Sequence, residues 1–186
     1  MFTVVAFYYY LDQKNKFTLN TVILTALISI AFMMRNTSPV GWIPLLAIKV
    51  LREGSLVPFI ISGLFVALPI LLFCVWVDTT MYKADTWVLT GYNFLEMNIL
   101  HGLSKTFGED DFWWYFKVQM PYNCTLLTPF VFLSTFYYHP KMCVNLNQTA
   151  YLTFYTIFYI CFFGFITHKE SRFMLPVWPF LMLTSA

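Results

Sequence analysis

Residues 56–77 read LVPFIISGLFVALPILLFCVWV, and this run determines which class of fold the chain can adopt. It contains no Asp, Glu, Lys or Arg, and as a helix it is long enough to cross the roughly 30 Å hydrocarbon core of a bilayer. Inside a bilayer the backbone must satisfy its own hydrogen bonds, which favours a helix over an open strand. The run therefore predicts a transmembrane helix.

Other apolar runs predict further crossings. Three charge-free runs of similar length are Phe17–Met34, Tyr122–Tyr138 and Ala150–Thr167. Three shorter apolar runs are Phe2–Leu11, Val40–Leu51 and Phe173–Thr184. The first and last of these shorter runs end at the chain termini and are interpreted as spans cut off there, so both ends look truncated. The middle one suits a short, tilted or re-entrant segment, and counting it as a crossing closes the topology.

The composition points to the same class of protein. Hydrophobic residues make up 59% of the 186 positions and charged residues 11%, whereas charged residues are about 25% of an ordinary soluble domain. A soluble core of this size could not bury so much apolar surface. We expect an all-α, polytopic transmembrane helical bundle. The net charge of +2 gives no reason to expect a nucleic-acid partner.

Counting the crossings places the connecting loops on alternating sides of the membrane. The side taken as cytosolic under the positive-inside rule carries Lys14, Lys16, Lys49, Arg52 and Lys141. The long segment 78–121 lies on the opposite side, has six acidic residues against three lysines, and is rich in aromatic rings that suit the membrane interface. The prediction is one membrane domain, residues 1–186, with one large interfacial loop at about 78–121.

The densest group of ionisable residues is His168-Lys169-Glu170-Ser171-Arg172, between two apolar runs. In a helix, His168 and Arg172 would share one face at a spacing of four residues. Cationic groups at an interface can bind a phosphate, Arg through its planar fork and Lys as a point charge. The same residues would also suit an anchor whose charged ends reach the headgroups. Both interpretations are open.

Charged and polar residues elsewhere offer weaker candidates. Arg35 follows an apolar run and could bind a phosphate or cap the span, and Asp78 could act as a base, a ligand or an interfacial cap. The segment Tyr92–Asn98 combines amides and an acid with aromatic rings. Such a mixture can bind a sugar, although packing at the interface explains the rings equally well.

No metal site is predicted. The adjacent acids Glu109–Asp111 are interpreted as a solvated turn, because neighbouring carboxylates rarely converge on one ion. The cysteines lack metal-ligand spacing and are interpreted as small apolar side chains: Cys74, Cys124, Cys143 and Cys161.

Several short blocks occur in a characteristic order: Arg35–Ser38, Asn93–Leu95, Trp114–Phe116, and His168–Phe173 with Pro176 and Pro179. In these blocks the sequence resembles the dolichyl-phosphate-mannose-dependent mannosyltransferases of the endoplasmic reticulum, over essentially its whole length. It departs from the family pattern in Asp110–Trp113, where His-Pro-Trp-His is usual, and at Lys83, where Gly is common.

The resemblance implies a GT-C-type bundle that crosses the endoplasmic reticulum membrane several times, with its active site facing the lumen. It implies transfer of mannose from dolichyl-phosphate mannose to a GPI-precursor glycolipid, as the third mannose and through an α-1,2 linkage. No cofactor or metal is expected, because the donor carries a monophosphate. Alternatives are a sister enzyme of lipid-linked oligosaccharide assembly, an inactive membrane fragment, and a transporter, which the scarcity of polar residues within the spans disfavours.

The resemblance also suggests roles for particular residues. Donor-phosphate binding is expected of His168, Lys169, Arg172 and Arg35. A substrate groove is expected to involve Asn93, Asn98, Trp114, Tyr115 and Asp78. The catalytic base is not assigned, since the family's His-Pro-Asp-Glu motif is absent from these 186 residues and is expected upstream.

Overall fold

The computed structural model describes residues 2–12, 16–35, 37–97, 101, 108–131, 133, 148–166 and 168–185. Every regular element among these residues is a helix, which confirms the all-α prediction. The chain divides into two compact units, Met1–Gly102 and Leu103–Ala186. The boundary between them falls inside the long interfacial loop expected at about 78–121, and the single membrane domain stays a prediction.

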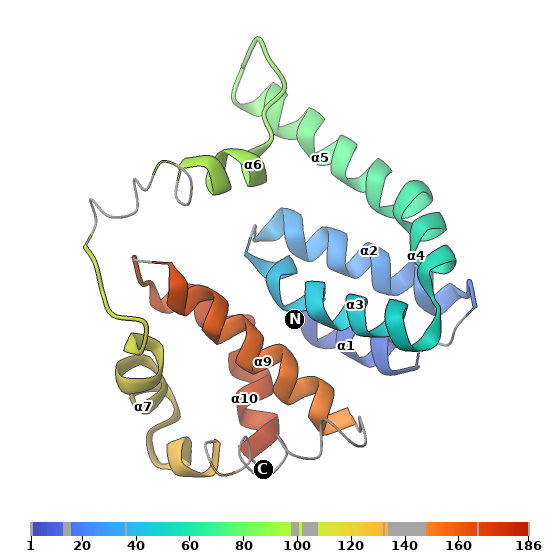
Figure 1. Cartoon of the computed structure of the whole chain (residues 1–186). Coiled ribbons are helices and arrows are strands. Elements are labelled where there is room, and N and C mark those ends of the chain that lie inside the picture. Colours follow the sequence, from blue (N-terminus) through green and yellow to red (C-terminus); the bar gives the residue numbers. More distant parts are fainter. Residues whose placement is uncertain are drawn as a thin grey trace. The chain divides into compact units, whose positions relative to one another are not determined.

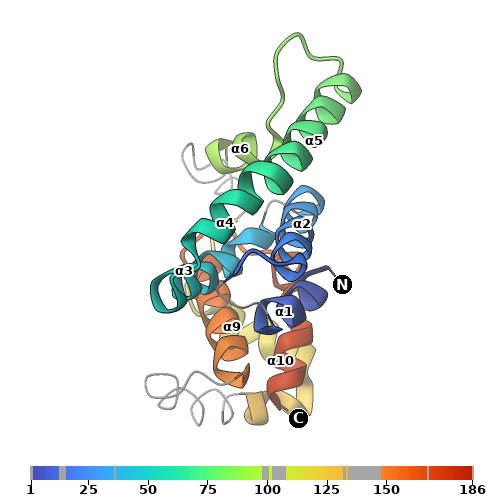
Figure 2. The same ribbon diagram turned by 90° about the vertical axis from the view of Figure 1, so that its right-hand side faces the viewer.

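The first unit begins with a pair of helices, α1 (Phe2–Asp12) and α2 (Leu19–Met34), which pack side by side (Figures 1 and 2). Near the connection between them, the Asn20 amide donates to the Asp12 carboxylate at 2.5 Å. A single 3₁₀ turn, η1 (Ser38–Gly41), leads from α2 into α3. Short segments of chain therefore join these elements.

Helix α3 (Trp42–Glu53) is joined to α1 through an aromatic cluster. The Tyr10 hydroxyl donates to the Leu45 carbonyl at 2.9 Å, and the Trp42 ring meets the Tyr10 ring edge-on with centroids 6.0 Å apart. The ammonium of the buried Lys49 lies 4.9 Å from the Tyr10 ring centroid. The stem of this lysine is thus used in packing between the two helices.

The apolar run at residues 56–77 lies in one long helix, shown in green in Figure 1. It comprises α4 (Leu56–Ser62), the π-helical turn η2 (Gly63–Ala67) and α5 (Leu68–Met81). The helix Leu56–Met81 has 26 residues and is long and apolar enough to cross a membrane. The helix predicted at residues 56–77 is therefore confirmed, and its length and composition are those of a candidate membrane span.

A polar contact joins this long helix to α2. The Thr25 hydroxyl donates to the Ser62 hydroxyl at 2.9 Å, and the Ser62 hydroxyl donates in turn to the Phe59 carbonyl at 3.1 Å. Hydroxyl contacts of this kind are common between helices that pack in lipid. On other parts of the helix large side chains are exposed, with Phe65 at 75% and Phe73 at 62%. Such exposure suits contact with lipid tails better than contact with water.

The second unit is organised by α9 (Gln148–Phe165), drawn in orange in Figure 1. One side of it carries a stack of buried rings at intervals of four residues, in which Tyr155 and Tyr159 are 6.0 Å apart and Tyr159 and Phe163 are 4.8 Å apart. Helix α10 (Trp178–Ser185) packs against α9, with Phe180 meeting Tyr155 edge-on at 5.0 Å. The remaining short elements are η5 (Tyr115–Gln119), α7 (Met120–Cys124), η6 (Thr125–Leu127) and η7 (Ser171–Met174).

The other predicted crossings are not confirmed as spans. Among the described residues, Leu56–Met81 is the one helix that meets the length and hydropathy expected of a span, while Leu19–Met34 and Ala150–Phe165 are shorter apolar helices. The run that begins at Tyr122 changes to a 3₁₀ turn at Thr125, whose φ of 46° interrupts the helix, and residues 134–147 lie outside the described part. The polytopic bundle is therefore a proposal.

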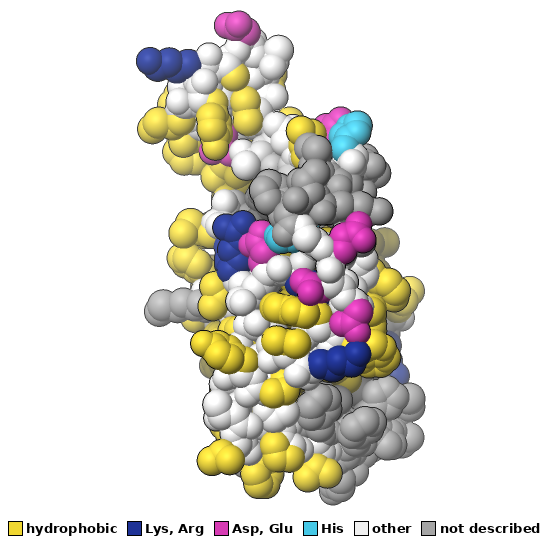
Figure 3. Space-filling model, turned by 90° about the vertical axis from the view of Figure 1, so that its left-hand side faces the viewer, with side chains coloured by type: hydrophobic (Ala, Val, Ile, Leu, Met, Phe, Trp, Pro, Cys, Tyr) yellow, Lys and Arg dark blue, Asp and Glu magenta, His cyan; other side chains and the backbone are white. Residues whose placement is uncertain are grey.

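The surface agrees with a membrane setting. Figure 3 shows hydrophobic side chains spread over the visible face, with charged side chains gathered in a few small groups. Soluble monomers rarely expose large apolar patches. The charged groups are thus the natural places to look for chemistry.

Candidate functional site

The candidate site lies in the second unit, where α9 ends. Helix α9 stops at Phe165, and the loop that follows turns back so that Lys169 reaches the end of the helix. The Lys169 ammonium donates to the carbonyls of Gly164 at 2.6 Å and Phe163 at 3.2 Å, and also to the carbonyl of Ile166. Carbonyls at a helix C-terminus lack partners within the helix and carry partial negative charge, so a lysine there satisfies both needs.

Lys169 is therefore occupied by the backbone. Its side chain is buried, at 6% exposure, and its ammonium also lies 5.7 Å from the Tyr115 ring centroid. Burial lowers the pKa of Lys169 below its usual range, and the charges of Asp110 and Asp111 partly oppose that change. This residue closes the helix instead of presenting a free cation.

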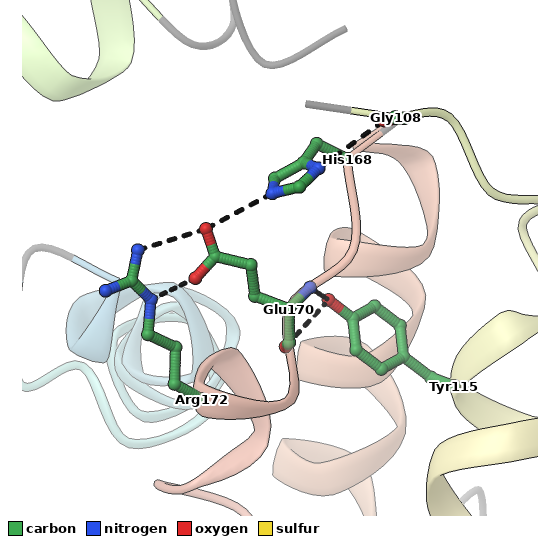
Figure 4. Close-up of polar contacts among 5 residues, drawn as sticks. All are labelled: Gly108, Tyr115, His168, Glu170 and Arg172. Carbon is green, nitrogen blue, oxygen red and sulfur yellow. Dashed lines mark hydrogen bonds and ion pairs between the residues drawn. The ribbon is translucent and has the colours of Figure 1, made fainter. Parts of the chain in front are cut away.

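The neighbouring charged residues form a cluster around one carboxylate (Figure 4). Glu170 accepts hydrogen bonds from Nε and Nη2 of Arg172, the second at 3.0 Å. One oxygen of the same carboxylate lies 3.3 Å from Nε2 of His168. We call His168, Glu170 and Arg172 the carboxylate cluster. A carboxylate held between two basic side chains fixes the positions of both.

His168 has an acceptor on each side of its ring. Its Nδ1 lies 3.4 Å from the Gly108 carbonyl oxygen, opposite the contact between Nε2 and Glu170. A neutral imidazole can donate to only one of these acceptors, whereas the imidazolium can donate to both. Both ring nitrogens thus have a partner within the protein, which fixes the orientation of the ring.

Arg172 is the most accessible cation of the cluster, with 68% of its side chain exposed. Its pKa is raised above the usual range, first by the hydrogen bond with Glu170 and then by the charge of that carboxylate. The bonds to Glu170 use Nε and Nη2, and among the described residues Nη1 has no hydrogen-bond partner. A guanidinium presents five N–H donors, so one edge of Arg172 is available to an anion.

A second layer of residues lies behind the cluster. The hydroxyl of Tyr115 accepts the Glu170 N–H at 3.3 Å and donates to the Glu170 carbonyl at 3.4 Å. Tyr115 begins the π-helical turn η5, and Gln119 ends it. The side-chain carbonyl oxygen of Gln119 accepts a hydrogen bond from the Ser171 hydroxyl at 3.1 Å. Tyr115 is 1% exposed and Gln119 is 5% exposed. Burial is the main reason why the pKa of Tyr115 is raised above its usual range, so the hydroxyl stays protonated.

The structure brings some of the predicted site residues together. His168, Lys169, Arg172 and Tyr115 meet at the end of α9, and Trp114 lies beside them, its ring edge-on to Tyr115 at 5.1 Å. The contacts of Lys169 and Tyr115 are those of buried supporting residues. The binding roles expected of all these residues stay predictions.

The other predicted site residues belong to the first unit. Arg35 follows the last residue of α2, and its N–H donates to the Ala31 carbonyl at 3.0 Å. Asp78, near the end of α5, accepts a hydrogen bond from the Thr90 hydroxyl at 2.6 Å. Asn93 is exposed on α6 (Thr90–Leu95), and Asn98 lies outside the described residues. Their roles stay predictions.

Sequence reasoning missed two residues of this site. Glu170 stands within the charged motif, but phosphate is bound by cations, so the motif suggested no role for an acid. Gln119 carried no signal, because a single glutamine in an aromatic loop has no distinctive spacing. Within the described part of the chain no group of three or more His, Cys, Asp or Glu residues could hold a metal ion, and the absence of a metal requirement stays a prediction.

Comparison with known proteins defines the class of protein to which this chain belongs. The sequence model of the Alg9-like mannosyltransferase family matches residues 1–186, so the chain belongs to that family. The chain is 30% identical over 97% of its length to GPI alpha-1,2-mannosyltransferase 3 of Bos taurus, and 29% identical over 97% to the protein of that name from Homo sapiens. It is 28% identical over 81% of its length to GPI mannosyltransferase 3 of Drosophila melanogaster.

The chain spans about a third of the length of these relatives, covering 32% of the bovine protein, 31% of the human protein and 27% of the fly protein. No solved structure matches it.

Proposed function

We propose that this protein transfers mannose from dolichyl-phosphate mannose to a GPI precursor, adding the third mannose through an α-1,2 linkage. The family match over residues 1–186 and the names of the relatives support this proposal. The apolar helix Leu56–Met81 supports a place in a membrane. We further propose that the protein crosses the endoplasmic reticulum membrane several times, with the carboxylate cluster on the luminal face.

In the proposed reaction a hydroxyl of the GPI glycan attacks the anomeric carbon of the donor. A new carbon–oxygen bond forms on one face of the sugar while the bond to the phosphate oxygen breaks on the other. The hydroxyl proton passes to a carboxylate base, and dolichyl phosphate leaves with the electron pair of the broken bond. Negative charge grows on that phosphate, so fixed cations beside it lower the barrier.

The geometry of Arg172 is the observation that carries the site assignment. Its guanidinium is held along one edge by Glu170 and has no described partner at Nη1. A preorganised arginine costs little reorganisation when the phosphate charge develops. His168 contacts the same carboxylate through Nε2, and it donates to a phosphate only by exchanging this contact or the one between Nδ1 and the Gly108 carbonyl. These two residues are our proposed ligands of the donor phosphate.

Lys169 is not included among these ligands, because its ammonium already serves the carbonyls that end α9. Arg35 remains a further proposed phosphate ligand. Asn93, Asn98, Trp114 and Asp78 remain proposed residues of the substrate groove.

The test uses the full-length polypeptide that contains these residues, expressed in cells blocked at the third GPI mannose. Arg172→Ala is compared with Arg52→Ala, which changes an exposed arginine in the last turn of α3. We expect the wild type and Arg52→Ala to restore the precursor that carries three mannoses, while Arg172→Ala leaves the two-mannose precursor in place. If the wild type leaves that block and instead corrects a block in lipid-linked oligosaccharide assembly, the acceptor is wrong. Full activity of Arg172→Ala would overturn the phosphate role.

A further inference from the structure

The carboxylate cluster depends on how the backbone of Glu170 is held. Glu170 precedes the 3₁₀ turn η7 in an extended conformation, with φ of −134° and ψ of 136°. Its carbonyl accepts the Phe173 N–H at 3.1 Å, which begins that turn, while its own N–H donates to the Tyr115 hydroxyl. The tyrosine hydroxyl also donates to the Glu170 carbonyl, so one side-chain oxygen bonds both ends of this residue. Tyr115 therefore fixes the position of the Glu170 backbone, from which the carboxylate side chain extends.

From Glu170 the geometry passes to the two cations. The carboxylate bonds two nitrogens of Arg172 and contacts Nε2 of His168. Because Arg172 is mostly exposed, its guanidinium has little else to fix its direction. A shift of the Glu170 backbone would therefore displace both proposed phosphate ligands together. Tyr115 itself is buried beneath the loop and is not in a position to touch a substrate.

A second bond from the same turn fixes the next residue. Tyr115 and Gln119 are four residues apart in η5, and both side chains reach the loop, Tyr115 to Glu170 and Gln119 to Ser171. Lys169, the residue before Glu170, is bonded separately to the carbonyl of Gly164 at the end of α9. Three consecutive loop residues, 169–171, are thus bonded to the rest of the second unit. These bonds fix the loop backbone that carries the side chains of the carboxylate cluster.

From this arrangement we infer that Tyr115 is a positioning residue for the donor: the π-helical turn Tyr115–Gln119 holds Glu170 and Ser171 so that Arg172 and His168 face the leaving phosphate. The inference rests on the proposed function, because it specifies how that site is kept in place. It gives Tyr115 a supporting role in place of direct contact with the sugar. It also explains why an aromatic residue with a hydroxyl, and not phenylalanine, stands at this position.

The experiment measures transfer by the full-length enzyme in detergent, varying donor and acceptor separately. Tyr115→Phe keeps the ring and removes the hydroxyl. We expect kcat/KM for dolichyl-phosphate mannose to fall about tenfold, as misplacement of binding groups does, while KM for the GPI acceptor is unchanged. The matched control is Tyr155→Phe, which alters an equally buried tyrosine about 15 Å before the end of α9. That variant is expected to keep the donor kinetics of the wild type.

Pairing with Arg172→Ala separates positioning from a general structural effect. If Tyr115 acts through the cluster, Tyr115→Phe should cost much less in an Arg172→Ala background than in the wild type, because contacting residues are not additive. Ser171→Ala, at an exposed residue, removes the hydrogen bond to Gln119 with little risk to folding. We expect this variant to lower donor kcat/KM about threefold in the same donor-selective way.

The outcomes distinguish the inference from the function on which it rests. No effect of Arg172→Ala would reject the phosphate role itself. A large effect of Arg172→Ala, combined with additive losses or losses that fall on the acceptor KM for Tyr115→Phe and Ser171→Ala, would reject only the positioning role. A donor-selective, non-additive loss supports it.

Discussion

The end of α5 and the end of α9 pose the same problem in the two units, since each is an apolar helix that stops at charged residues. At the end of α5, Asp78 is engaged by the Thr90 hydroxyl, and Thr79 accepts the Val88 N–H at 3.0 Å. These two bonds fix the start of the loop that follows α5. Among the described residues, no cluster of cations forms at this helix end. At the end of α9, Lys169 takes the closing role, so the other charged residues can form the carboxylate cluster. Assigning the capping to one residue leaves its neighbours available for binding.

The largest expected effect is on transfer. Arg172→Ala should lower kcat/KM for the donor about 100-fold or more, as loss of one charge-stabilising donor does in other enzymes. Thr79→Val, at the other helix end, removes the acceptor of the Val88 N–H and should change the same constant less than about threefold. Steady-state kinetics with dolichyl-phosphate mannose test both. Equal losses in the two variants would remove the distinction between the helix ends.

Stability should also separate the two helix ends, through the residue that caps α9. Lys169→Met removes the donor to three carbonyls, and leaving buried acceptors without partners costs about 2–3 kcal/mol. Asp78→Asn, whose contact with Thr90 is only partly buried, should cost about 1 kcal/mol or less. Unfolding in detergent, followed by the loss of helical circular dichroism, measures both. A Lys169→Met protein as stable as the wild type would show that the cap is dispensable.

Alkaline pH offers a test of Tyr115. Because its pKa is raised in the folded protein, the unfolded chain loses this proton near pH 10 while the folded chain keeps it. The folded state then binds more protons, so stability is present below about pH 10 and is lost as pH rises above it, by up to about 1.4 kcal/mol per pH unit. Tyr115→Phe should show a shallower loss between pH 9 and 11. Parallel unfolding curves would contradict the shift.

The smallest expected effect lies in the turn after α5. Lys83 has φ of 51°, in the left-handed region, where residues other than glycine cost about 1–2 kcal/mol. Lys83→Gly removes this strain but gives the unfolded chain more freedom, which costs about 0.5–1 kcal/mol. The net result should be a gain of about 0.5 kcal/mol, measured by the same unfolding experiment, with Lys117→Gly as the control in a helical turn. Destabilisation by Lys83→Gly would show that the lysine side chain has a role of its own.

The sequence predicted those features that depend on a single property of a continuous run. The absence of charge from residues 56–77 was enough to place the long helix, and the charged motif after α9 identified the three basic residues at the candidate site. The sequence could not show that Lys169 differs in role from His168 and Arg172. Capping by Lys169 depends on α9 ending at Phe165, two residues before the apolar run ends. The sequence also could not foresee Tyr115 and Gln119 beneath the loop, because their partners lie more than fifty residues away in the chain.

Hydropathy was least informative about where helices stop. The apolar run Tyr122–Tyr138 contains no charge, yet the helix that enters it ends at Cys124 and a 3₁₀ turn follows. That change is a matter of backbone geometry at Thr125, to which a scale of side-chain polarity is insensitive. Likewise Phe173–Thr184 contains prolines at 176 and 179, and it forms a turn before the short helix α10.

The π-helical turn η2 within the long helix has a consequence for comparing relatives position by position. A π turn closes its hydrogen bond over five residues instead of four, as seen where the Leu68 N–H bonds to the Gly63 carbonyl. It holds one residue more than an α turn of the same helix would need. A relative with an unbroken α-helix here should therefore align with a one-residue gap within 63–67, and an ungapped alignment would place every later lipid-facing side chain about 100° out of phase.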